Sequence, residues 1–183
     1  GVLRTTLADQ GFATLSVQMP VLAADAPRDD YQALFADAGE RLTAAVAWLH
    51  DNGYARVAVV SHSLGAAMVN AWLAQHDERV VDAWVPVGMF VAFASRPREP
   101  VLDVVGERDF PEVLAAAKAR TAKLPGDGCS ASQVIAGADH YFGDAAQRLA
   151  ASIAPFPTST RPFRTPVTNV PSRTSTPSRS RSF

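Results

Sequence analysis

Hydrophobic and polar positions along the chain predict strands and helices that follow one another in turn. Short apolar runs, typical of strands that are covered on both faces, recur between longer stretches with a helical repeat. The predicted strands cover residues 12–18, 56–60, 80–87, 101–105 and 132–136. The predicted helices cover residues 2–10, 31–51, 64–75, 111–123 and 144–153. This alternation predicts an α/β fold with a mostly parallel sheet of about five strands, flanked by helices.

The composition changes after Ala154. Residues 155–183 hold six of the thirteen prolines, many Ser and Thr residues, and almost no aliphatic side chains. Such a segment cannot bury enough apolar area to offset the entropy of an ordered chain, so we expect it to be disordered. Its arginines would suit a basic tail that docks onto a partner. An extension unrelated to the domain is the alternative, and it is the simpler interpretation. The predicted organisation is one folded domain over residues 1–154 and a tail over residues 155–183.

Charge and composition narrow the class of protein. Five of the 17 basic residues lie beyond residue 155 and none of the 18 acidic residues does, so the predicted domain is mildly acidic. That balance argues against nucleic acid as its partner. No apolar run of about 18 residues predicts a membrane span. The single cysteine, Cys129, permits no intramolecular disulfide. The sequence determines neither the cellular compartment nor the oligomeric state of the protein.

Patterns for metal and cofactor sites are missing from the sequence. No two of its four histidines have the spacing of metal ligands, and it has no glycine-rich loop of the P-loop or dinucleotide-binding type. We therefore expect neither a metal site nor a cofactor.

The clearest chemical pattern lies where a predicted strand runs into the alanine-rich helix behind it. The sequence there is Ser61-His62-Ser63-Leu64-Gly65. Small residues lie two positions before and after Ser63, as in the G-x-S-x-G nucleophile elbow, with serine in place of the first glycine. Such a turn exposes the central hydroxyl and directs the N-terminus of the next helix at it. The backbone N–H of Leu64 is then a candidate donor to an oxyanion.

Two further polar residues follow the carboxyl ends of later predicted strands, where open α/β sheets place their chemistry. Asp109 follows the fourth strand, and His140 follows the fifth. Asp103 and Asp139 are alternative acids. Asp103 lies within a strand, and Asp139 is adjacent to the histidine and cannot easily turn back onto it, so the pattern favours Asp109. We predict Ser63 as nucleophile, Asp109 as acid and His140 as base.

The chain order nucleophile, acid, base, together with the elbow, resembles that of the α/β-hydrolase superfamily over residues 1–154. Residues 11–20, GFATLSVQMP, are similar to those of bacterial members known only as hydrolase-like. The resemblance implies a serine hydrolase that cleaves an ester or related acyl bond in a small-molecule substrate. Ser63 would form an acyl-enzyme, His140 would act as base, Asp109 would orient His140, and Leu64 would supply an oxyanion donor.

The sequence departs from the family pattern in two places. The loop over residues 90–99 is too short for a lid domain. The family also has three strands before the helix predicted at residues 2–10, with a second oxyanion donor after the third, so we expect an N-terminally truncated domain. That third strand would lie between residues 12–18 and 56–60, and its loss should leave a gap or make those two strands pair. A catalytically silent module that binds a ligand or partner is therefore the alternative.

Overall fold

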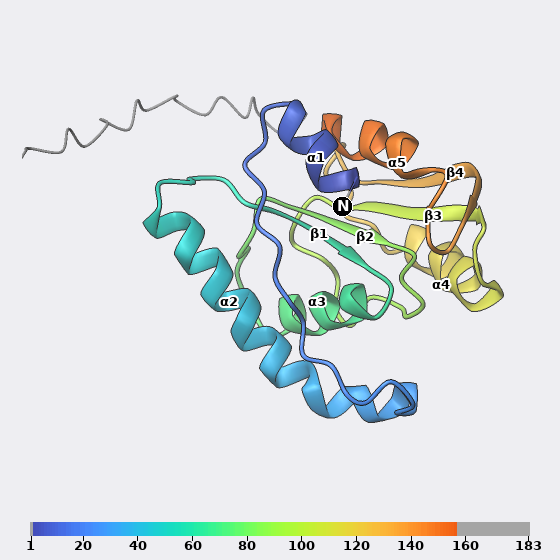
Figure 1. The fold of residues 1–183 in the computed structure, drawn as a ribbon, viewed down its shortest axis with the longest axis horizontal. Coiled ribbons are helices and arrows are strands. Elements are labelled where there is room, and N and C mark those ends of the chain that lie inside the picture. Colours follow the sequence, from blue (N-terminus) through green and yellow to red (C-terminus); the bar gives the residue numbers. More distant parts are fainter. Residues whose placement is uncertain (1, 157–183) are drawn as a thin grey trace, which may run out of the picture.

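The computed structural model describes residues 2–156. Its centre is a parallel sheet of four strands that lie side by side in chain order (Figure 1). The strands are β1 (Ala58–His62), β2 (Ala83–Val87), β3 (Leu102–Arg108) and β4 (Ala131–Asp139). The predicted α/β class with a parallel sheet is confirmed.

Helices cover both faces of this sheet, as Figure 1 shows. One face carries α1 (Val2–Asp9) and α5 (Ala146–Ile153), which contact each other. The other carries α2 (Phe35–Asp51), α3 (Leu64–Ala74) and α4 (Pro111–Thr121). A 3-10 helix, η1 (Arg28–Leu34), leads into α2, so the long predicted helix begins at residue 35 rather than 31. The other predicted helices, and four of the five strands, form within three residues of the expected bounds.

The two-residue repeat of β2 explains why the core has two parts. Ala83, Val85 and Val87 pack into the cluster that α5 covers. Trp84, which points the other way, packs into the cluster formed with α2 and α3. Successive side chains of a strand point to opposite faces, so a strand covered on both sides must be apolar throughout.

Pro86 lies within β2 and does not end it. The N–H groups of Trp84 and Gly88 donate to the carbonyls of Pro100 and Val104 at 3.0 and 2.8 Å. The residue midway between them is Pro86, which has no N–H to give to β3. The pairing of β2 with β3 is correspondingly sparse, whereas all five residues of β2 pair with β1.

The strand expected over residues 12–18 does not form, which corrects the expected count of strands to four among the described residues. This segment is irregular and passes outside β1 on its way from α1 to α2 (Figure 1). No described strand lies beside it to pair with its backbone. Of the two expected outcomes, a gap is found: a cavity of about 1270 Å³, lined by residues 12–17, Met19, β1, α1, α2 and α5.

The expected boundary between domain and tail lies close to the end of the described residues. Phe156 lies two residues beyond the expected end of the domain, yet it is buried and packs into the core with α5. The rest of the expected tail, residues 157–183, lies outside the described residues. Within the described range, no helix is long and apolar enough to cross a membrane.

Candidate active site

Ser63 is the single residue between β1 and α3. Its backbone has φ 53° and ψ −122°, a left-handed conformation that costs a residue with a side chain about 1–3 kcal/mol. Hydrogen bonds hold this backbone on both sides. The Ser63 N–H donates to the carbonyl of Val87 on β2 at 2.9 Å, and the Ser63 carbonyl accepts from the N–H of Ala66 at 3.0 Å. The sheet and the first turn of α3 thus fix the direction of the hydroxyl.

The structure brings Ser63, His140 and Asp109 into one chain of hydrogen bonds. Nε2 of His140 lies 2.9 Å from Oγ of Ser63, and Nδ1 lies 2.7 Å from Oδ1 of Asp109. A carboxylate can only accept a hydrogen bond, so Nδ1 of His140 must carry the ring proton and donate a hydrogen bond to Asp109. Nε2 is then free of a proton and accepts a hydrogen bond from the Ser63 hydroxyl. This arrangement can remove the hydroxyl proton as the oxygen attacks.

Backbone N–H groups hold the Asp109 carboxylate in place. Oδ1 accepts from the N–H of Phe110 at 2.8 Å, and Oδ2 accepts from the N–H of Gly106 at 3.3 Å. Asp109 and His140 are each only 6% exposed. The pair is therefore held away from solvent, where its hydrogen bond is stronger than in water.

The two alternative acids serve other purposes. Asp103 is fully buried and pairs with Arg120 of α4 through two contacts of 2.9 Å. Burial raises the pKa of Asp103 in spite of the opposing effect of Arg120. Asp139 accepts from the N–H groups of Tyr141 and Phe142, and so shapes the turn that carries the histidine. Of the three candidate acids, Asp109 is the one hydrogen-bonded to His140.

The elbow pattern gives no role to His62, and its contact with His140 was not predicted. Nε2 of His62 donates to the backbone carbonyl of His140 at 2.8 Å, and the two rings lie 4.9 Å apart. Burial lowers the pKa of His62, which favours the neutral form of its ring. Its position directly before Ser63, at the carboxyl end of β1, was the available signal.

Two glycines allow the ends of β2 and β3 to come close to His140 and the residues before it. A Cβ on Gly88, which has φ +59°, would lie 3.2 Å from two atoms of the His140 ring. A Cβ on Gly106 would lie 2.5 Å from the carbonyl oxygen of Ala138. The absence of side chains at these positions therefore makes room for the histidine and its turn.

The small residues two positions before and after Ser63 have different surroundings. A Cβ on Gly65 would meet nothing within 4 Å, so no close contact among the described residues requires glycine there. Oγ of Ser61 accepts from the indole N–H of Trp84 at 3.0 Å. Serine in place of the usual glycine therefore satisfies a buried donor.

The N-terminus of α3 directly follows the proposed nucleophile. Helix N-termini leave their first N–H groups without partners inside the helix and carry a partial positive charge. Leu64 is the first residue of α3, directly after Ser63. Its N–H remains the predicted donor to a developing oxyanion.

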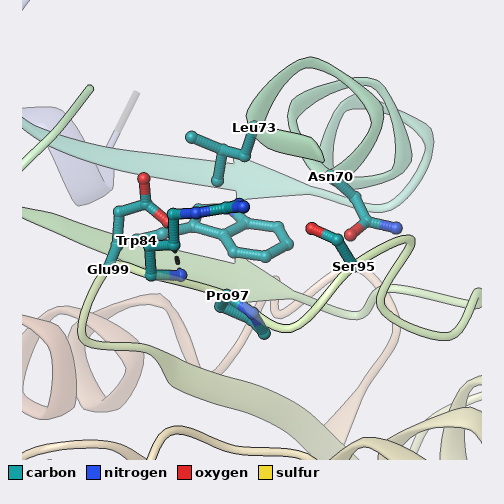
Figure 2. A pocket seen from close by; sticks show the side chains of 7 residues that line it. Asn70, Leu73, Trp84, Ser95, Pro97 and Glu99 are labelled. Carbon is teal, nitrogen blue, oxygen red and sulfur yellow. Dashed lines mark hydrogen bonds between the residues drawn. The ribbon is translucent and has the colours of Figure 1, made fainter. Parts of the chain in front are cut away.

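The small pocket shown in Figure 2 lies beside α3 and Trp84, and its volume of about 10 Å³ suits no more than a water molecule. On its rim, Asn70 donates to the carbonyl of Ala92 at 2.9 Å and accepts from the N–H of Ala94 at 3.1 Å. These bonds fasten the short 90–99 loop to α3. Within residues 2–156, no group of three or more His, Cys, Asp or Glu side chains could hold a metal ion.

No protein-family model and no curated protein sequence matches the chain. Solved structures are similar to it. A CIB-like hydrolase from Thermoplasma acidophilum superposes with a TM-score of 0.53 at 22% identity, covering 67% of this chain and 58% of that one. The esterase domain of a Rhodothermus marinus protein gives 0.60 at 17% identity, covering 84% and 77%. A Rhodococcus esterase gives 0.60 at 14% identity, covering 85% and 84%.

These similarities concern the fold. The chain spans 58% of the length of the Thermoplasma hydrolase, and the three identities are 22% or less. The chain has the fold of the α/β-hydrolases.

Proposed function

We propose that this protein is a serine hydrolase that cleaves an ester or related acyl bond through an acyl-enzyme on Ser63. The observation that carries the proposal is the continuous chain of hydrogen bonds from Ser63 through His140 to Asp109. The likeness of the fold to two esterases supports an acyl substrate. No cofactor enters the reaction.

In the first half of the reaction, Oγ of Ser63 attacks the carbonyl carbon while its proton passes to Nε2 of His140. The oxyanion that forms accepts a hydrogen bond from the N–H of Leu64. Asp109 stabilises the imidazolium through Nδ1. The bond to the leaving oxygen then breaks as that oxygen takes the proton from Nε2, which leaves the acyl group on Ser63.

In the second half, a water molecule attacks the acyl-enzyme and gives a proton to Nε2 of His140. The bond between the acyl carbon and Oγ breaks, the carboxylic acid leaves, and the proton returns to the serine oxygen. Leu64 is the single oxyanion donor that we assign. One donor of this kind typically contributes about 10²–10³-fold to the rate of an enzyme.

Labelling with a fluorophosphonate probe tests the proposal. Wild type should label, and Ser63→Ala should not. His140→Gln should label at least about 10³-fold more slowly, because the hydroxyl loses its base. Ser95→Ala, a serine in the small pocket of Figure 2, is the matched control and should label like wild type. Circular dichroism must show that each variant is folded.

Two results would contradict the proposal: a folded wild type that does not label, or labelling that persists in Ser63→Ala. The first result would favour the alternative of a silent module that binds a ligand or partner. The large cavity beside β1 is the observation that supports this alternative.

A further inference from the structure

Two large aromatic side chains remain exposed beside His140. Phe110 is 39% exposed and Tyr141 is 74% exposed. Single exposed apolar residues are common on protein surfaces and need no explanation. These two are different because they contact each other and the same histidine, so they form one aromatic surface.

The geometry of this surface is specific. The ring of Phe110 stacks on the ring of His140, with 4.5 Å between centroids and 30° between planes. Tyr141 lies edge-on to Phe110 at 6.3 Å and 89°, and edge-on to His140 at 5.5 Å and 80°. A bound molecule in contact with these rings would cover apolar area that water now reaches.

Hydrogen bonds restrain the backbone of both aromatic residues. The N–H of Phe110 donates to Oδ1 of Asp109, and Phe110 directly precedes α4. The N–H of Tyr141 donates to Oδ1 of Asp139 at 3.0 Å. Both aromatic residues directly follow a residue of the proposed triad, so the surface lies beside it.

We propose that Phe110 and Tyr141 form a shelf that binds the alcohol portion of the substrate and prefers an aromatic one. This inference rests on the proposed function. Nε2 of His140 gives its proton to the leaving oxygen as the bond to the acyl carbon breaks, so the leaving group must lie against the histidine. In the proposed mechanism the acyl oxygen is bound separately, by the N–H of Leu64.

Aromatic rings prefer offset-stacked or edge-to-face partners, which adds selectivity beyond simple burial of apolar area. One such pair corresponds to about a 2- to 12-fold effect on a rate or binding constant. A planar aromatic alcohol can form these contacts with Phe110 and Tyr141. A saturated ring of similar size can only bury area against them.

The test compares benzyl acetate with cyclohexylmethyl acetate, which share an acyl group and have leaving alcohols of similar size and acidity. Wild type should have the higher kcat/KM on benzyl acetate. Tyr141→Leu should lower kcat/KM for benzyl acetate about 3- to 10-fold and change the value for cyclohexylmethyl acetate less than about twofold. Phe110→Leu, the second variant, should lower the same ratio.

Trp48→Leu is the matched control, because Trp48 is an aromatic residue on α2 that is 52% exposed. It should leave the ratio of the two kcat/KM values unchanged. A purely structural role of Tyr141 would lower both values together, so an unchanged ratio in both shelf variants would overturn the shelf. Fluorophosphonate labelling of wild type would still uphold the proposed function in that case. Absence of labelling would overturn the proposed function and the shelf with it.

Discussion

Gly106→Ala tests whether the close approach of β3 to the turn before His140 sets the geometry of the site. A Cβ at this position would lie 2.5 Å from the carbonyl oxygen of Ala138, 2.8 Å from that of Asp139 and 2.9 Å from the carbonyl carbon of Ala138. Cβ atoms essentially never come within 3.0 Å of another atom, so the chain must move by about half an ångström or more. All three atoms belong to the backbone, so no side-chain rotation can relieve the overlap.

The size of the effect follows from that displacement. Overpacking of this kind lowers the free energy of unfolding by about 1–3 kcal/mol. The moving backbone leads directly into His140, and the N–H of Gly106 itself donates to Asp109. A misplacement of about 1 Å can cost a reaction about 10²-fold, so we expect fluorophosphonate labelling of Ser63 to slow by about 10- to 100-fold.

Urea unfolding followed by circular dichroism measures the first effect, and labelling kinetics measure the second. Gly65→Ala is the matched control, because its Cβ would meet nothing within 4 Å. This control should leave the free energy of unfolding unchanged or raise it by up to about 1 kcal/mol, since alanine favours a helix. The reasoning is wrong if Gly106→Ala unfolds at the wild-type urea concentration and labels at the wild-type rate.

Two further predictions concern the residues before the proposed nucleophile. Ser61→Ala removes the acceptor of the buried Trp84 indole N–H, and should lower the free energy of unfolding by about 1–3 kcal/mol in chemical denaturation. If the hydrogen bond is the cause, most of that loss should be absent in a Trp84→Phe background. Burial lowers the pKa of His62 in the folded state, so the unfolded state takes up its proton first as the pH falls. The stability linked to His62 should therefore be fully present above about pH 6.5 and be lost as the pH falls below it. Melting temperatures should show this loss in wild type and not in His62→Gln, and parallel curves for the two would contradict it.

Local patterns were enough to predict most of the architecture. Helices and strands depend on the spacing of apolar residues over one or two turns or a few strand residues, and that spacing can be read directly. The edge at which Ser63, Asp109 and His140 meet follows from the same reading. Each lies at the carboxyl end of a strand, and the carboxyl ends of parallel strands share one edge.

Contacts between distant segments required the tertiary structure. Residues 12–18 have the pattern of a strand, but a strand also needs a neighbour, and no described strand lies beside them. Asp103, Asp109 and Asp139 all have the right side chain for an acid; their positions along the chain favoured Asp109, and their hydrogen-bond partners show what each one contacts. Trp84 likewise shows why position 61 is serine, through a bond across 23 positions of the chain. Periodicity describes neighbours along the chain, whereas hydrogen bonding and exposure depend on residues that only folding brings together.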